Sequence, residues 1–327
     1  MRLIISVLAF LATVALQASP LKCNYSSADI SLKESEHVSL AGFAARTKLS
    51  DGEHLPLRTH CLVITDGQQK ICIISNDLME TSPALTDQIR DRISIATGLG
   101  RDNILMHNIH THSAPRMMGK WTLPGGTNYL YSLRACDAIV ANAVKTISDD
   151  KAFKDFFLET GRTTTYFQGN RCEKEGPVDH DVYAARLVDR KGRPVCAFIN
   201  LACHPVCMGP KSVMQSSDYS GVARNLIRGK WGCEVFQFTG AAGNIDPAEG
   251  PKTVEYAEQC GRALAADLEK VEFTRVKDCG TLMKYNNVSH LPYSIPEVTK
   301  EAVHKLADSI SVTYKTEFPR FAEDVRS

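Results

Sequence analysis

The feature that most constrains the fold is a regular alternation of strand-like and helix-like segments. Residues 59–67 and 70–78 are apolar, β-branched runs around an Asp-Gly turn, which predicts a hairpin or two adjacent strands. Residues 82–100 open with Ser-Pro, space their apolar residues at helical intervals and end in Gly, which predicts a helix. The apolar segment 103–110 predicts the next strand.

The same alternation continues through most of the remaining chain. We expect helices over 127–149, 220–232 and 253–271, and strands over 156–167, 181–189, 194–203 and 233–240. This order favours the α/β class, as a layered domain with a mixed β-sheet flanked by helices. We find no internal sequence repeat. Functional residues in such sheets gather on loops at the strand ends.

Length and composition exclude few functions. The 327 residues are enough for one large core or two modest ones, and 43% hydrophobic with 23% charged residues is ordinary globular composition. The net charge of +1 gives no electrostatic argument for binding nucleic acid or an anionic membrane surface. We therefore predict no nucleic-acid partner, and nothing in the sequence predicts a protein partner.

The N-terminus has the pattern of a secretory signal peptide over residues 1–19. An early arginine precedes an apolar run from Leu3 to Leu16, and small residues follow at Ala18 and Ser19. The apolar run is shorter than the roughly 20 residues that a bilayer-spanning helix needs. An uncleaved N-terminal anchor is the alternative. We expect residues 20–327 to be the exported domain, secreted or periplasmic.

The sequence has eleven cysteines, and an exported chain can form disulfides between them. Cys72 and Cys196 lie inside apolar strand-like runs, where a free buried thiol is the commoner state. The pair Cys203 and Cys207 could indicate a thiolate metal site. No second pair at zinc-finger spacing accompanies it, so we favour a structural role.

Polar residues that could take part in catalysis or metal binding lie at four predicted strand ends. His110 and His112 follow one predicted strand, and the strand period of two places them on one face. One could therefore bind a metal while the other faces a substrate. His204 ends a second strand, Arg171 lies in a turn-rich loop, and Asp246 lies in a glycine-rich exit from a third strand.

Each of these features alone has an ordinary structural interpretation, as a hydrogen-bonded loop residue, a surface cation or a turn. Together they favour a zinc-dependent hydrolase, because neutral imidazole is a common zinc ligand. Zinc lowers the pKa of a bound water to about 7, which makes hydroxide available at neutral pH. A second, unligated histidine could stabilise an oxyanion or move a proton, a contribution of roughly 10²–10⁴-fold.

In this order along the chain, the segments resemble the neutral/alkaline non-lysosomal ceramidase family, specifically its N-terminal catalytic domain. The resemblance runs from about residue 41 to about residue 270. Its segments are AGFAAR (41–46), ISNDL (74–78), HTHSAP (110–115), NR and VD (170–171 and 178–179), CHPVCMGP (203–210), SSDYSG (216–221) and GAAGNIDP (240–247).

The resemblance implies roles for individual residues. His110 and His204 match the family's two zinc histidines, and His112 matches a histidine that lies beside the substrate and supports catalysis. Arg171 matches an arginine that the family requires for activity. Such enzymes hydrolyse the amide of ceramide to a sphingoid base and a fatty acid. The implied cofactor is Zn²⁺, and the implied partner is a ceramide-like lipid, with peripheral contact to membrane lipid.

Two segments depart from the family pattern. The family's Gly-Asp-x-Ser-Pro loop carries a serine implicated in activity, and Asp246 stands at that position, so Asp246 must face away from developing oxyanion charge or act as a base. The family also completes its zinc site with a glutamate and a tyrosine from a later segment, and we find neither motif after residue 271. We therefore expect a short member without that segment, in which Asp77, Asp218 or Asp246 replaces the missing ligands or activity is impaired.

Two alternatives remain open at this stage. One is a related exported hydrolase that acts on another amide or ester. The other is a non-catalytic relic or ligand-binding protein, which the missing zinc ligands favour.

Overall fold

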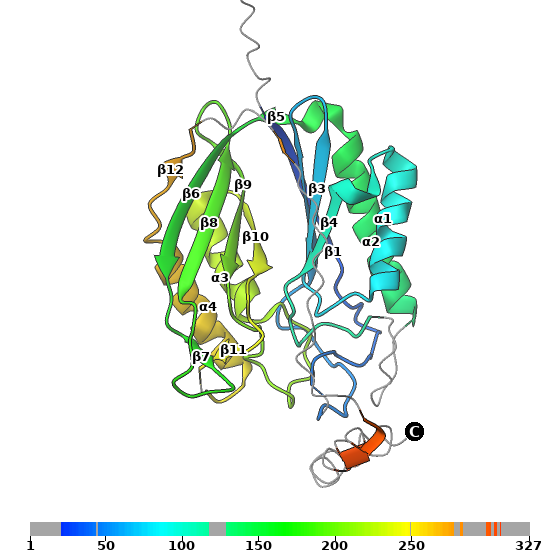
Figure 1. The fold of residues 1–327 in the computed structure, drawn as a ribbon, viewed down its shortest axis with the longest axis vertical. Helices are drawn as coiled ribbons and strands as arrows, with labels where there is room; N and C mark the ends of the chain where they lie inside the picture. The colour runs from blue at the N-terminus through cyan, green and yellow to red at the C-terminus, as the bar shows by residue number, and fades with distance from the viewer. Residues whose placement is uncertain are drawn as a thin grey trace, which may run out of the picture.

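The protein is represented by a computed structural model that describes residues 21–277 apart from 44, 118–128 and 249, together with 282–283, 299–301, 304–305 and 308. The described chain forms four layers, in which two five-stranded sheets face each other and a helix pair covers the outer face of each sheet (Figure 1). The predicted α/β layered class is confirmed. The strands, however, divide between two mixed sheets, where the sequence predicted one. The expected signal peptide lies outside the described residues.

The first sheet has the strand order β4-β3-β2-β1-β5, with α1 and α2 against one face. Strands β3 and β4 of this sheet pair in parallel, and the other neighbouring strands of the sheet pair antiparallel. Its elements are β1 (Lys22–Asp29), β2 (Arg58–Thr65), β3 (Lys70–Asn76), α1 (Pro83–Thr97), the 3₁₀ turn η1 (Arg101–Asn103), β4 (Ile104–Asn108), α2 (Tyr129–Ser148), the 3₁₀ turn η2 (Asp150–Ala152) and β5 (Lys154–Asp155).

The second sheet has the order β10-β9-β8-β6-β12, and β9 and β10 form its parallel pair. A separate two-stranded ribbon pairs β7 with β11. The elements are β6 (Phe157–Thr164), β7 (Gln168–Asn170), β8 (Asp181–Val188), β9 (Pro194–Leu201), α3 (Asp218–Trp231), β10 (Glu234–Thr239), β11 (Ile245–Pro247), α4 (Val254–Leu268) and β12 (Thr274–Arg275).

The helix boundaries follow the capping signals in the sequence. Ser82 accepts a hydrogen bond from the Leu85 N–H at the start of α1, and Gly98 ends that helix in the left-handed conformation. Thr253 accepts the Tyr256 N–H at the start of α4 in the same way. The predicted hairpin is β2 with β3, and every other predicted helix and strand between 82 and 271 is confirmed with boundaries shifted by a few residues.

Successive side chains along a strand point to opposite faces of its sheet, so they pack into different cores. On β2, Cys61 and Val63 pack with α1 and α2, whereas Leu62 packs into the layer between the two sheets. That layer includes a stack of Tyr25 and His60 from the first sheet with Phe236 from the second. The two sheets therefore share one apolar interface, and their lower strand ends meet beneath it (Figure 1).

The described cysteines are free thiols, and all except Cys172 are buried. Cys72 and Cys196 are fully buried, as predicted for free thiols in strands. Cys203 and Cys207 belong to the core beneath α3 and α4, which supports their structural interpretation.

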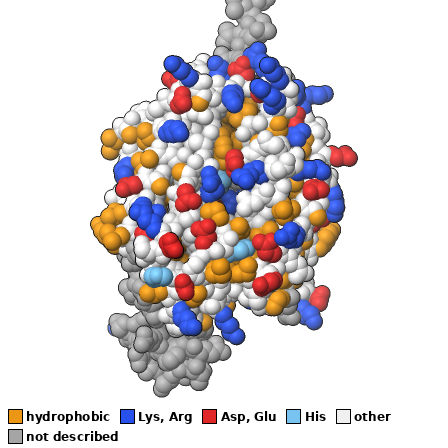
Figure 2. Space-filling view, turned by 180° about the vertical axis from the view of Figure 1, so that it is seen from behind, with side chains coloured by type: hydrophobic (Ala, Val, Ile, Leu, Met, Phe, Trp, Pro, Cys, Tyr) orange, Lys and Arg blue, Asp and Glu red, His pale blue; other side chains and the backbone are white. Residues whose placement is uncertain are grey.

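Two further observations concern the surface and length of the elements. None of the helices in the described part of the chain is both long and apolar enough to cross a bilayer. On the rear face, basic, acidic and hydrophobic side chains are interspersed, and no single sign of charge covers a broad area of that face (Figure 2).

Candidate metal centre

Three histidines from two loops meet at the lower ends of the sheets. His110 and His112 follow β4, and His204 follows β9. Each offers one ring nitrogen, and these atoms all lie within 4.8 Å of one another. The ring centroids of His110 and His112, and of His110 and His204, are 5.0 Å apart, and those of His112 and His204 are 5.6 Å apart. The structure therefore brings together the histidines that the sequence singled out.

His110 and His204 share an arrangement that metal-binding histidines usually have. The Nδ1 of His110 lies 3.0 Å from the carbonyl oxygen of Met79, and the Nδ1 of His204 lies 3.1 Å from that of Ile245. A ring nitrogen facing a carbonyl must carry the proton, so Nε2 of each ring keeps its lone pair. A carbonyl oxygen that accepts the Nδ1–H in this way fixes the tautomer and orientation of a ligand histidine.

His112 differs from the other two. Both its ring nitrogens are buried, and neither has a hydrogen-bond partner among the described residues. Burial, and after it the neighbouring His110 and His204, lowers its pKa to about 3, so the ring is neutral at neutral pH. Buried polar atoms without partners are rare, and they indicate a position where a ligand completes the hydrogen bonding.

The backbone around the cluster is shaped for these rings. His110 has a φ of 68°, a conformation that costs a non-glycine residue free energy and is concentrated at functional sites. Gly42 has a φ of 96°, and a Cβ there would lie 2.2 Å from Cγ of His112. The ring of Phe43 contacts the His112 ring edge-on. Only glycine at position 42 permits His112 to occupy its place.

A buried guanidinium holds the same backbone. Arg46 donates from Nη1 to the carbonyl oxygens of Ala41 and His112, at 2.8 and 2.9 Å, and from Nη2 to that of Gly209 at 3.1 Å. Burial, and after it Arg116, lowers the Arg46 pKa to about 10, so it remains a cation. The AGFAAR segment thus contributes a support for His112, a role that its sequence did not reveal.

Asp246 and Arg171 extend the cluster on the His204 side. An oxygen of Asp246 lies 3.4 Å from Nδ1 of His204 and 3.5 Å from Nη1 of Arg171. Arg171 also donates from Nη2 to the carbonyl oxygen of Gly243 at 2.7 Å. All five predicted site residues therefore lie in one connected group, and the negative charge of Asp246 faces the Arg171 cation.

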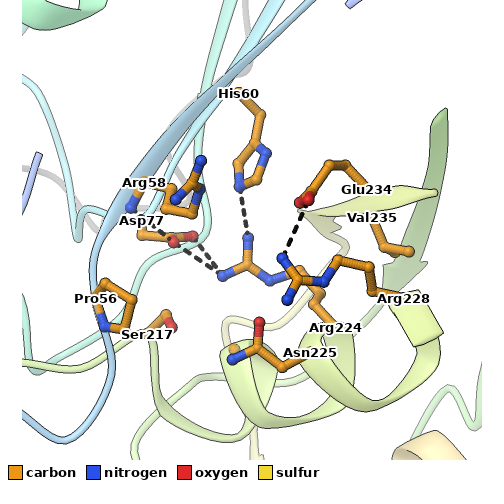
Figure 3. Close-up of a pocket in the computed structure, with 11 residues that line it drawn as sticks. Pro56, Arg58, His60, Asp77, Ser217, Arg224, Asn225, Arg228, Glu234 and Val235 are labelled. Carbon is orange, nitrogen blue, oxygen red and sulfur yellow. Dashed lines mark hydrogen bonds and ion pairs between the residues drawn. The ribbon is translucent and has the colours of Figure 1, made fainter. Parts of the chain in front are cut away.

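The other two candidate ligands have different partners. Asp77 forms a buried ion pair with Arg224, with both carboxylate oxygens within 2.9 Å of Nη2, and it lies in a separate polar pocket that Arg58 and Arg228 also line (Figure 3). Asp218 is fully buried and accepts backbone N–H groups. Among the described residues, the donor group consists of the three histidines, without a carboxylate.

This donor set fits zinc. Neutral imidazole nitrogens are typical zinc ligands, and the cluster holds lone pairs on rings whose orientation is already fixed. The unpartnered nitrogens of His112 leave a polar position beside the ligand pair.

Comparison with known proteins agrees with the geometry. The family description "Neutral/alkaline non-lysosomal ceramidase, N-terminal" matches residues 24–235. The chain belongs to this family. The matched region contains His110, His112, Arg171 and His204, whereas Asp246 lies beyond it.

Curated ceramidases align with a similar region. The chain is 25% identical to "Neutral ceramidase B" of Dictyostelium discoideum over 214 residues, 59% of this chain and 29% of that protein. It is 22% identical to "Neutral ceramidase 1" of Arabidopsis thaliana over 208 residues, 58% of this chain and 27% of that protein. The chain spans less than a third of the length of these relatives.

Solved ceramidase structures share the fold. A structure described as "Ceramidase complexed with C2" and one of neutral ceramidase from Pseudomonas aeruginosa each have a TM-score of 0.65 and 18% identity. Each match covers 77% of this chain and 44% of the solved chain. At this identity the likeness establishes the architecture, and it agrees with the four-layer arrangement.

Proposed function

We propose that this chain is a zinc-dependent amidohydrolase that cleaves the amide of an N-acylsphingosine into a sphingoid base and a fatty acid. The observation that carries the proposal is the division of the histidine cluster. Two rings have Nδ1 on a carbonyl and Nε2 free, and the third has both nitrogens free. Family membership and the names of the matched relatives, which are neutral ceramidases, support the substrate class.

In this proposal Nε2 of His110 and Nε2 of His204 hold the zinc ion. When bound, zinc supplies a Lewis acid and lowers the pKa of a bound water to about 7. His112 faces the substrate. Because its ring is neutral, one nitrogen carries a proton, and that N–H donates a hydrogen bond to the carbonyl oxygen as negative charge develops there. Gly42 and Arg46 keep that ring in place.

Arg171 and Asp246 act on the edge of the site. Asp246 stands beside Nδ1 of His204, where its negative charge favours the proton on that nitrogen and so the lone pair on Nε2. Arg171 neutralises Asp246, which limits its repulsion of developing oxyanion charge. The aspartate thus serves a different purpose from the serine that the family places in this loop.

We also propose that residues 1–19 direct export, to the periplasm or the outside of the cell, and that residues 20–327 form the catalytic domain. Because the substrate class is a membrane lipid, we propose peripheral contact with membrane lipid during capture. A fusion of residues 1–19 to a reporter enzyme tests the first point: the reporter should be exported, and it should stay in the cytoplasm when Leu8 and Leu11 are replaced by Asp.

The decisive experiment measures zinc content and hydrolysis of a labelled ceramide on the same purified protein. We expect near-stoichiometric zinc in the unmodified protein and in His112→Ala, and zinc loss in His110→Ala and His204→Ala. His112→Ala should lower kcat/KM by about 10²–10⁴-fold. His37→Ala is a matched control, because Nδ1 of His37 also faces a carbonyl, that of Ser50, away from the cluster.

The remaining outcomes identify the alternatives. Zinc binding with turnover of other amides or esters, and none of ceramide, would replace the proposal with a related hydrolase. Protein that binds no zinc and turns over no substrate would favour the relic or ligand-binding interpretation. Full zinc occupancy with activity unaffected by His112→Ala would contradict the role assigned to that ring.

A further inference from the structure

The three histidines belong to loops 110–113 and 204–208, and something must hold these loops in register. One direct bond joins them, from the His112 N–H to the Pro205 carbonyl oxygen at 3.1 Å. The segment Ser216–Asp218, which enters α3, contacts both loops. These contacts lie away from the ring nitrogens, so the segment does not itself reach the metal or the substrate.

Ser216 fixes the first loop. Its N–H donates to the Ser113 carbonyl oxygen at 2.9 Å, and its own carbonyl oxygen accepts the Thr111 hydroxyl at 2.8 Å. Thr111 stands between His110 and His112 and is fully buried, so its position sets the directions of both neighbours. Ser216 is fully buried as well. Two bonds thus attach the loop on either side of His112 to one residue.

Asp218 fixes the second loop. Its carboxylate accepts the N–H of Cys207 and the N–H of Met208, each at 3.2 Å, just after His204. It also accepts the N–H of Tyr219, whose hydroxyl donates to the Cys203 carbonyl oxygen at 2.8 Å, just before His204. The Asp218 N–H in turn donates to Oγ of Ser216 at 2.8 Å. The two anchors are therefore directly bonded to each other.

Asp218 is costly for the fold to maintain. Asp77 and Asp218 are the only fully buried carboxylates in the described part of the chain, and Asp77 is paired with Arg224. No ion pair of the described residues includes Asp218, so hydrogen bonds from backbone N–H groups and from the Cys207 thiol take the place of a counter-ion. Its φ of 58° adds backbone strain. A buried carboxylate without a counter-ion and a strained backbone conformation both cost free energy, and they persist where the surrounding structure holds them in place.

We propose that Asp218, through Ser216, is a positioning residue that holds the loop of His204 against the loop of His110 and His112. Its catalytic consequence rests on the zinc function proposed above. Asn at this position keeps one accepting oxygen but places an NH₂ group against a backbone N–H of the 207–208 turn. The turn must then move, and His204 moves with it.

The test compares Asp218→Asn with Tyr131→Phe in the full protein. Tyr131 is a matched control, because it is a fully buried hydroxyl that donates to a carbonyl oxygen, that of Ile30, in the other core. We expect Asp218→Asn to weaken zinc affinity about 10–100-fold, the usual effect of losing an outer-shell partner. It should lower kcat on labelled ceramide with little change in KM, and shift the ring NMR signals of the three histidines.

Tyr131→Phe should change thermal stability without changing zinc affinity, the kcat-to-KM pattern or the ring signals. If Asp218→Asn does not fold, Ser216→Ala replaces it, with a smaller change in the same readouts because it removes the Oγ that links the two anchors, together with the contact of that Oγ with Nδ1 of His54. The proposal is overturned if the folded variant keeps wild-type zinc affinity and wild-type ring signals. Wild-type protein without zinc would sink the zinc function, yet the ring signals would still report whether Asp218 positions the histidines.

Discussion

The two halves of the molecule have the same topology but carry different parts of the site. The first half runs β1-β2-β3-α1-β4-α2, and the second runs β6-β8-β9-α3-β10-α4 with β7 and β11 inserted. In each, the third and fourth strands form the parallel pair at the sheet edge. The sequence shows no repeat, so this correspondence is visible only in the fold.

The difference between the halves lies in the connection from third strand to helix. In the first half residues 77–82 suffice, whereas in the second half residues 202–217 make the same connection. The longer loop carries His204 and returns to the first half, where it pairs with residues 51–54 and with His112. A common framework thus becomes a site because one half has an enlarged loop that meets the strand ends of the other.

The largest loss of unfolding free energy should follow from breaking the charge pair that joins the two halves. Asp77 directly follows β3 in the first half, and Arg224 comes from α3 in the second (Figure 3). Because their side chains are only 1% and 7% exposed, Arg224→Met leaves a buried carboxylate without a counter-ion and should cost about 3–5 kcal/mol of unfolding free energy. Urea unfolding followed by circular dichroism measures it.

The control for this prediction is Arg92→Met, which removes an exposed pair between α1 and α2 within one half, with side chains 41% and 66% exposed. That change should cost at most about 1 kcal/mol. Equal losses for the two variants would show that the contact between halves is no more important than a surface pair.

The sequence predicts the framework because its signals are local. Helical spacing with Ser and Gly caps identified α1, and apolar β-branched runs identified β2 and β3. Strand β1 was missed because it reads KCNYSSAD. Its polar side chains are satisfied by a distant helix, as in Asn24 donating to the Thr146 carbonyl oxygen. Which strands share a sheet is likewise a long-range property, so one sheet was predicted where two exist.

The same division holds for the site. His110, His112 and His204 could be selected because histidines at strand ends meet when strands are neighbours. The role of Asp218 could not be predicted, because an aspartate at the start of a helix looks like an ordinary cap. Its partners Cys207 and Met208 become neighbours only when the fold forms. The family resemblance implied the split between His112 and the other two rings, and the carbonyls of Met79 and Ile245 supply a physical basis for it that the sequence does not show.

A change in stability of intermediate size should follow from glycine substitutions in the helix pair of the second half, which packs differently from that of the first half. Helices α1 and α2 contain no glycine, whereas Gly261 of α4 lies against α3. A Cβ at Gly261 would lie 2.4 Å from Cβ of Val222 and 2.8 Å from the Tyr219 carbonyl oxygen. Gly261→Ala should therefore destabilise the protein by about 1–3 kcal/mol in urea unfolding. Gly229→Ala, with no atom near its Cβ, should instead stabilise by about 0.5–1 kcal/mol. Two values of the same sign would contradict close packing of α3 on α4.

The smallest effect should be a pH dependence at the interface between the sheets. Nε2 of His60 accepts a hydrogen bond from Arg224, and burial, followed by Arg224 and Arg58, lowers the His60 pKa well below 6.5. The folded protein keeps this ring neutral while the unfolded chain takes up a proton below pH 6.5, so its contribution is present above that pH and lost as pH falls. Between pH 7.5 and 5.5 the loss should be roughly 1 kcal/mol.

His60→Gln isolates that contribution. The buried rings of His107, His112 and His204, whose pKa values burial also lowers, remain in the variant and keep part of the acid sensitivity. The slope of the unfolding free energy against pH between 7.5 and 5.5 reports how many more protons the unfolded chain binds than the folded protein. In His60→Gln that number should fall by at most one. An unchanged slope would mean that His60 is protonated or solvated in the folded state. The Tyr25–His60–Phe236 stack between the two sheets would then be less closed to water than its burial indicates.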